Sequence, residues 1–394
     1  PGKVIIVLGI TEQRTGSLTG GLGYSGAQGV FGQVGLQESN LVGRSWSTNT
    51  NLTYGEYGAL LNLSLYDPWI KNDKHRTSFR TSLYLSREVP QEFRSQDGGS
   101  IRGVGDRYES VTSSISYDIN KTHTINSDSF GSFATVDAAK ADAPQYSWFD
   151  YEGDSIVLER TGGGFSFARP LNGGQPLKKV PWSVLLGANF QKVRPIDYSG
   201  EKRPYGVASP NFKNNKAPEN EVICVAYNCA KENTLVSFKS AVTYNNLDNP
   251  RNPTSGNYLN IGSEQFIGLG DNSPTFNRSR VSYSRFYPVN LLKFHKGCRP
   301  KPGEKLECSQ AIGFQAKMGT IVGELPPYEA FCLGGTSSVR GWSSCDLGVA
   351  RNYGEATAEY RFPIWRLLSG ALFVDAGTDF GSQSSVPGKP GKIL

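Results

Sequence analysis

The strongest constraint on the fold of this chain is an alternation of apolar and polar side chains with a period of two residues. In 57–65, the apolar residues Tyr57, Ala59, Leu61, Leu63 and Leu65 take alternate positions, with mostly Gly, Asn and Ser between them. Because successive side chains of a β-strand point to opposite faces, this pattern predicts a strand with one apolar face. Four further segments alternate in the same way: 78–86, 110–119, 182–191 and 310–320.

Weaker alternation is present in six other segments: 29–37, 45–54, 156–168, 234–244, 256–267 and 275–286. Eleven strands are therefore predicted before residue 322, and 353–362 and 369–377 add two more. Most are close to the 9–11 residues that a tilted strand needs to cross a bilayer. A soluble β-sandwich also alternates, but with shorter strands in one compact domain. We favour an all-β fold, a transmembrane antiparallel β-barrel.

The composition agrees with this choice. Only 37% of the residues are hydrophobic and 19% are charged, and no run of about 18 apolar residues is present, so no transmembrane helix is predicted. In a barrel only alternate residues face lipid, so the average can stay polar. The net charge of +6 is small, and neither a basic helix nor an aromatic RNA-binding motif occurs, so nucleic acid is not an expected partner.

Two long polar connections, 120–155 and 194–233, are rich in Gly, Pro, Asn, Asp and Ser. Connections this long are unusual in compact soluble domains but normal on the external side of outer-membrane barrels. Counting crossings from 29–37 places both connections and 322–352 outside, with 322–352 as the sixth outer connection. The same count places the turn Tyr54–Tyr57, 88–108 and 287–309 on the inner rim.

The N-terminal part has a different character. Val4–Leu8 is typical of the last strand of a small preceding domain, and no secretory signal is present, so the chain is expected to begin inside a longer precursor. The glycine-rich stretch 20–29 lacks the lysine of a phosphate-binding loop and is interpreted as the lead into the first barrel strand. We therefore divide the chain into a preceding domain and linker, 1–20, and a barrel, 21–394.

Six cysteines form three close pairs in sequence: Cys224 with Cys229, Cys298 with Cys308, and Cys332 with Cys345. Local, even-numbered spacing favours disulfides in an oxidising compartment. Free thiols and zinc are the alternatives, but no CxxC is present and His295 alone among the histidines lies near a cysteine. No metal or cofactor is predicted.

One arginine, Arg340, lies among small residues in the connection 322–352. On the strands that follow, alternation directs Glu359 to the polar face of 353–362, and directs Phe373, Asp375 and Gly377 to the inner face of 369–377. A planar guanidinium suits bidentate pairing with either carboxylate, and such charge-assisted bonds contribute about 1.5–3 kcal/mol. An exposed Arg-Gly-Trp turn with a solvated aspartate is the competing interpretation.

Four motifs then indicate a family: Pro326–Phe331, Leu333–Trp342, Ala358–Pro363 and Phe373–Gly377. Together they resemble the outer-membrane protein 85 superfamily, and the stretches 29–34, 40–44, 67–69 and 248–253 are similar to it as well. The segments 323–331 and 369–375 are similar to its cyanobacterial or chloroplast branch.

The resemblance implies a 16-stranded barrel preceded by periplasmic POTRA domains, the last of which would end within 1–12. It implies that the loop 322–352 folds into the lumen with Val339, Arg340, Gly341 and Trp342 at its tip. Asp375 would be the lumenal partner of Arg340, with Glu359 lining the same wall. Two departures stand out: the family motif usually ends in Phe or Tyr where this chain has Trp342, and about three further strands would follow, so the chain is expected to be a fragment.

The resemblance also implies a function. The chain would be a non-enzymatic component that assembles and inserts β-barrel proteins, in the outer membrane of a Gram-negative-type, cyanobacterial bacterium or in the chloroplast outer envelope. Its partners would be unfolded outer-membrane clients and the lipid bilayer, with lipopolysaccharide and accessory assembly subunits also considered. The alternative is a polypeptide-conducting channel of the two-partner secretion or chloroplast import type. No Ser-His-Asp, zinc or P-loop arrangement favours an enzyme.

Overall fold

The structure is a computed structural model that describes residues 14–25, 28–90, 101–104, 157–175, 180–197, 200–202, 205–208, 222–293, 296–299, 309–342, 345, 347–365 and 368–380. These residues form strands and three short 3-10 helices, η2 (Tyr227–Cys229), η3 (Lys296–Cys298) and η4 (Pro327–Glu329). Within these ranges, no helix combines the length and apolar character needed to cross a membrane.

One sheet of thirteen strands dominates the fold, and its strands follow one another in sequence order. They are β1 (Gly16–Ser25), β2 (Gly29–Leu41), β3 (Trp46–Gly55), β4 (Gly58–Asp67), β5 (Ser78–Glu88), β7 (Val157–Pro170), β8 (Trp182–Ile196), β11 (Asn233–Asn245), β12 (Gly256–Gly268), β13 (Phe276–Pro288), β14 (Ala311–Gly323), β17 (Asn352–Trp365) and β18 (Leu368–Phe380). A second sheet joins β6 (Ile101–Val104), β9 (Tyr205–Ala208) and β10 (Val222–Cys224).

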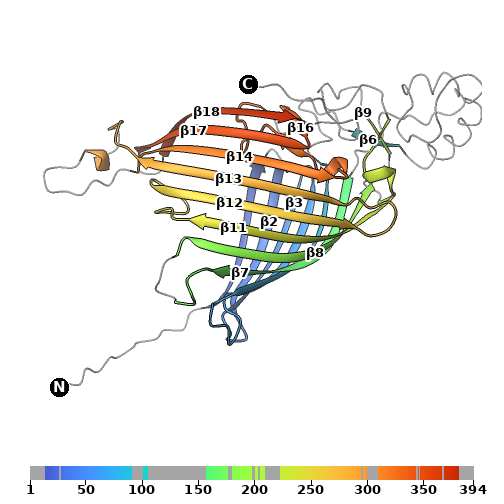
Figure 1. Ribbon diagram of the computed structural model, residues 1–394, viewed down its shortest axis with the longest axis horizontal. Helices are drawn as coiled ribbons and strands as arrows, with labels where there is room; N and C mark the ends of the chain where they lie inside the picture. Colours follow the sequence, from blue (N-terminus) through green and yellow to red (C-terminus); the bar gives the residue numbers. More distant parts are fainter. Residues whose placement is uncertain are drawn as a thin grey trace, which may run out of the picture.

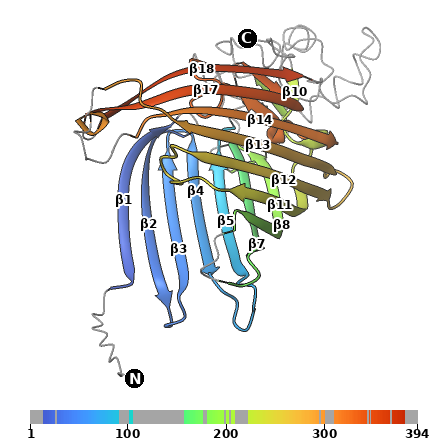
Figure 2. The same cartoon turned by 60° about the vertical axis from the view of Figure 1, so that its left-hand side comes forward.

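All neighbours in the large sheet are antiparallel, as a chain of hairpins requires. The sheet curls, so that β1–β5 run across the direction of β11–β18 (Figures 1 and 2). In the described part, β1 and β18 are each hydrogen-bonded to one neighbour, β2 and β17. The sixteen strands implied by the family resemblance stay a prediction.

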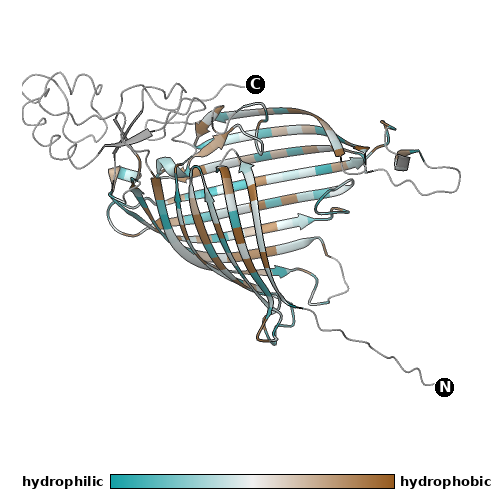
Figure 3. Cartoon of the chain, turned by 180° about the vertical axis from the view of Figure 1, so that it is seen from behind, coloured by the Kyte–Doolittle hydropathy of each residue, from teal (hydrophilic) through white to brown (hydrophobic). Residues whose placement is uncertain are grey.

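The two faces of the sheet differ in chemistry. Large apolar side chains stand exposed on the outer face, among them Leu63, Leu83, Phe165, Leu186 and Val374. Figure 3 shows how apolar and polar residues alternate along the strands. The opposite, inner face carries the arginines and carboxylates described below. A large exposed apolar surface around a polar interior is the inverse of a soluble protein and is what lipid requires of a transmembrane barrel.

Twelve of the thirteen predicted strands are confirmed within the sheet. The remaining one, 110–119, lies outside the described residues. The prediction missed β1, because the frequent glycines of Gly16–Ser25 concealed the alternation of Leu18, Leu22 and Tyr24. The sheet therefore starts at Gly16, and the predicted boundary between linker and barrel at residue 20 is wrong. The preceding POTRA segment, 1–12, lies outside the described residues.

The missed strand also inverted part of the predicted topology. We call the end of the sheet that carries 324–351 the loop end. The turn between β3 and β4 lies at this end, not on the opposite rim, since Tyr57 packs against the cluster of Val89, Val157 and Ile196. The segment 88–108 was placed on the inner rim, but β6 pairs with β9 from the connection between β8 and β11, which is at the loop end.

Because β5 pairs directly with β7, the connections after β7 lie at the ends of the sheet that the sequence predicted. The connection after β13 stays at the opposite end, and 324–351 stays the sixth connection at the loop end. The missed strand β1 adds one crossing to the predicted count, and 110–119, which is not part of the described sheet, removes one. The later connections therefore keep their predicted ends.

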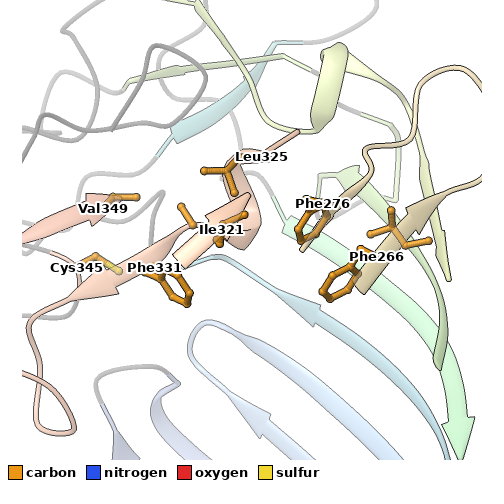
Figure 4. Close-up of a cluster of buried hydrophobic side chains, with 9 residues drawn as sticks. Phe266, Phe276, Ile321, Leu325, Phe331, Cys345 and Val349 are labelled. Carbon is orange, nitrogen blue, oxygen red and sulfur yellow. The ribbon is translucent and has the colours of Figure 1, made fainter. Parts of the chain in front are cut away.

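The loop 324–351 turns back over the inner face of the sheet. It contains η4 and a two-stranded ladder of β15 (Phe331–Leu333) and β16 (Gly348–Ala350). The base of the loop is held by apolar packing on the ends of β12, β13 and β14, which Figure 4 shows around Phe266, Phe276 and Ile321. From the loop, Leu325, Phe331, Cys345 and Val349 enter the same cluster.

Candidate functional site: the inward loop

Arg340, at the tip of the loop, contacts two neighbouring strands. Its Nε and Nη2 donate to the two carboxylate oxygens of Asp375 on β18, at 2.7 and 2.8 Å, and its backbone N–H donates to the same group at 3.0 Å. Nη1 donates to Glu359 on β17. The guanidinium carbon lies 3.5 Å from the ring centroid of Phe373. One arginine is thus held by two carboxylates and an aromatic face, a strong and directional contact.

Small residues make room for this contact. A Cβ on Gly377 would come within 2.7 Å of the Val339 side chain, which is buried at 2% exposure. Gly341 has a φ of 93°, a conformation that favours glycine. Trp342 is 45% exposed, and its carbonyl accepts from the N–H of Gly335 at 2.9 Å. Its ring does not take part in the anchor, so the departure from Phe or Tyr is accommodated at an open position.

A third set of contacts lies between the tip and the base. The Ser338 hydroxyl donates to Glu355 on β17, and Lys317 on β14 donates to the carbonyl of Ser337 at 2.7 Å. Lys317 also lies 3.6 Å from Glu355. The loop is therefore bound to β14, β17 and β18 along its return path.

A second anchor lies at the base of the loop, where no sequence pattern predicted a contact. Glu329, at the end of η4, is 5% exposed and accepts from Arg160 on β7 at 2.6 Å and from Arg278 on β13. Arg160 also donates to the carbonyl of Tyr328 at 3.3 Å. β7 and β13 are separated by β8, β11 and β12. This carboxylate therefore joins two distant parts of the sheet through the loop.

Tyr328 extends the second anchor. Its hydroxyl donates to Oδ1 of Asn233 on β11 at 2.8 Å, and the guanidinium of Arg160 lies 5.1 Å from its ring centroid. The only sequence signal for this anchor was the motif Pro326–Phe331, which pointed to a family and not to partners. The partners are distant in sequence, Arg160 by 169 residues and Arg278 by 51, and alternation alone does not pair them.

The loop residues of the two anchors, Glu329 and Arg340, are ionised. Burial opposes ionisation of Glu329, but Arg278 and Arg160 outweigh it and hold the pKa of this carboxyl below its ordinary value of 4.5. The hydrogen bond to Asp375 raises the pKa of Arg340 against the opposing effect of burial. Neither Glu329 nor Arg340 is expected to titrate near neutral pH.

The loop borders two cavities. One, of about 600 Å³, lies between η4 and the wall made by β5, β7, β8 and β11–β13. The other, of about 390 Å³, lies beside Ser337, Ser338 and Tyr353. The loop therefore narrows the interior without filling it.

The cysteine at the start of the loop is joined to the one near its end, since Cys332 and Cys345 form a disulfide. Cys229 and Cys298 are also disulfide-bonded. Cys308 and the side chain of Cys224 lie outside the described part of the chain, so those two pairings stay predictions. Among the described residues, no group of three or more His, Cys, Asp or Glu side chains is placed to hold a metal ion.

An antiparallel sheet with an apolar outer face, and a loop anchored on its polar inner face, defines a transmembrane β-barrel protein with a lumenal loop. Residues 40–393 match the Omp85 superfamily domain, and the chain belongs to this superfamily. The family assignment made from the motifs is thereby confirmed. Membership and relatives place the protein in an outer membrane, bacterial or of the chloroplast envelope, and in the cyanobacterial or chloroplast branch.

Similar proteins support this assignment. The chain is 23% identical over 396 residues to "Outer envelope protein 80, chloroplastic" of Arabidopsis thaliana, which covers 99% of this chain and 41% of that protein. It is 37% identical over 127 residues to "Protein TOC75, chloroplastic" of Pisum sativum, covering 32% of this chain and 15% of that protein. The chain thus spans less than half of either relative.

Among solved structures, the fold is similar to BamA from Haemophilus ducreyi lacking POTRA domains 1–3. The TM-score is 0.54 at 15% identity, and the match covers 94% of this chain and 58% of that one. At this identity the likeness describes the fold.

Proposed function

We propose that this chain forms the membrane part of a protein that assembles other β-barrel proteins and inserts them into the outer membrane. The observation that carries the proposal is the loop fixed on the inner face by two separate anchors, Arg340 with Asp375 and Glu359, and Glu329 with Arg160 and Arg278. A loop fixed in this way keeps the sheet in shape and obstructs the interior. Client strands would then pair at the edge of the sheet and would not pass through the lumen.

The edge strand in this proposal is β1. On its second side it offers backbone N–H and C=O groups, and in the described sheet it is paired only with β2. A client strand can add to such an edge by β-augmentation, where the ladder supplies affinity without requiring a particular sequence. The sequence pattern made 29–37 the first strand of the barrel, but that segment is β2, which is paired on both sides. The partners are unfolded outer-membrane clients and the bilayer, and the function is not enzymatic.

A conduit for polypeptides is the second candidate. The observation in its favour is the pair of polar-lined cavities that flank the loop, of about 600 and 390 Å³. In this case the loop would have to leave the interior for transport.

Depletion of the protein in its host separates the two. The insertase proposal expects outer-membrane barrels to fail in assembly as a class, measured by their protease-resistant folded fraction. Normal barrel assembly together with accumulation of one exported or imported substrate would overturn it in favour of the conduit. A disulfide that locks the loop to β18 sharpens the test, since an insertase keeps working with a fixed loop and a conduit stops.

A further inference from the structure

The larger cavity has an unbalanced charge. Five basic side chains line it, against two carboxylates, Glu264 and Glu329; the basic residues are Arg80, Arg160, Lys239, Arg278 and Arg280. They come from β5, β7, β11 and β13, so positive charge surrounds the space from several sides. The lower dielectric of an enclosed space strengthens the attraction of such a wall for anions.

The two carboxylates are already engaged by three of these basic groups. Glu329 binds Arg160 and Arg278. Glu264 lies 3.2 Å from Arg278 and 3.7 Å from Lys239. These pairs account for the acidic charge of the cavity.

Arg80 and Arg280 remain. Neither has a carboxylate partner among the described residues, and both are exposed to the interior. Each stacks on one aromatic ring, Arg80 on Tyr66 at 5.2 Å and Arg280 on Phe331 at 5.0 Å. Stacking orients a guanidinium by its face and leaves its N–H donors at the edge available.

The wall of the cavity already binds one carboxylate. Glu329 is a carboxylate on a peptide segment, held between two arginines from different strands. The cavity also presents neutral polar groups, including Tyr84, Asn189 and Gln191, that can bind a peptide backbone.

We propose that this cavity is a binding site for an acidic polypeptide segment, whose carboxylates pair with Arg80 and Arg280 beside the Glu329 anchor. That the segment belongs to a client rests on the proposed function; the binding site itself does not. The site selects carboxylates on an extended chain over free anions, because two arginines on separate strands require two linked acidic groups.

The test measures binding of a fluorescein-labelled hexaglutamate peptide to the purified full chain in detergent, by anisotropy at low and moderate salt. We expect saturable binding that weakens with added salt, and no comparable binding of hexaglutamine. The double variant Arg80→Gln/Arg280→Gln should lower affinity about tenfold or more, the scale of one lost charge-assisted pairing. The matched control Arg44→Gln/Arg251→Gln removes the same charge from exposed turns and should bind like the parent.

Wild-type affinity in Arg80→Gln/Arg280→Gln, or equal binding of hexaglutamine, would overturn the proposal. Displacement of the label by inorganic phosphate as effective as by unlabelled hexaglutamate would instead assign an anion site and reject a peptide site. Circular dichroism and thermal unfolding establish that each variant is folded. Since no assembly step is involved, absence of hexaglutamate binding by the parent chain rejects this site alone, while intact barrel assembly on depletion rejects the proposed function alone.

Discussion

Both anchors of the loop consist of ion pairs between arginine and carboxylate groups, but the groups are arranged differently. At the tip, one arginine from the loop meets two carboxylates on the adjacent strands β17 and β18. At the base, one carboxylate from the loop meets two arginines on β7 and β13, with three strands between them. The tip pins the loop to one hairpin, whereas the base couples distant parts of the curled sheet.

The reach of the two anchors differs, although their burial is matched. The Asp375 side chain at the tip is 3% exposed and the Glu329 side chain at the base is 4% exposed. The tip holds two strands that already pair with each other, whereas Glu329 joins strands that are not neighbours in the sheet. We therefore expect the base to govern the stability of the fold and the tip to govern the position of the loop.

The largest expected effect is that of Glu329→Ala. It leaves Arg160 and Arg278 facing each other without their shared carboxylate, and breaking a buried pair in this way costs about 3–5 kcal/mol. Denaturant unfolding of the purified chain in detergent measures the loss. Glu324→Gln, which removes an exposed charge from the same loop and keeps an acceptor for the Thr275 backbone N–H, is the control and should cost under about 1 kcal/mol. Equal losses of unfolding free energy in the two variants would show that the buried Glu329 contributes no more than an exposed carboxylate.

The tip is tested by a double-mutant cycle. Arg340→Ala and Asp375→Ala should each destabilise the loop by about 1.5–3 kcal/mol, because each removes the bidentate pair. The double variant should be little worse than either, as read from the rate at which protease cleaves the loop. Additive losses would show that the two residues act separately.

Packing at the tip gives a smaller effect. Gly377→Ala places a methyl group against Val339, and the crowding should cost about 1–2 kcal/mol. Adding Val339→Ala should recover part of the loss, measured by thermal unfolding. Gly354→Ala on β17 meets nothing within 4 Å and serves as the matched control. Failure of Val339→Ala to restore stability would place the strain elsewhere.

The smallest expected effect near neutral pH is the change in loop stability with pH. Since the pKa of Glu329 is lowered in the folded protein, its contribution is fully present above the ordinary value of 4.5 and is lost as pH falls through the lowered value. Loop cleavage by an acid-active protease should therefore rise as pH decreases below 4.5, and less steeply in Glu329→Gln. An unchanged pH profile in that variant would assign the transition to another group.

The sequence by itself determined the sheet and the inner face of its last hairpin. Alternation with a period of two is a local property, so it placed Glu359, Phe373, Asp375 and Gly377 on the inner face of two consecutive strands. Because a hairpin makes neighbours of strands adjacent in sequence, Glu359 and Asp375 could be placed on neighbouring strands. Their contact with Arg340 was an expectation from the family resemblance.

Only the tertiary structure decided the base of the loop and the cavity beside it. Glu329, Arg160 and Arg278 meet because the sheet curls, and curvature accumulates from small twists between strands that no local pattern records. For the same reason Arg80 and Arg280, which lie 200 residues apart in the numbering of the chain, line one cavity. The first strand, hidden by its glycines, became evident only through its pairing with β2.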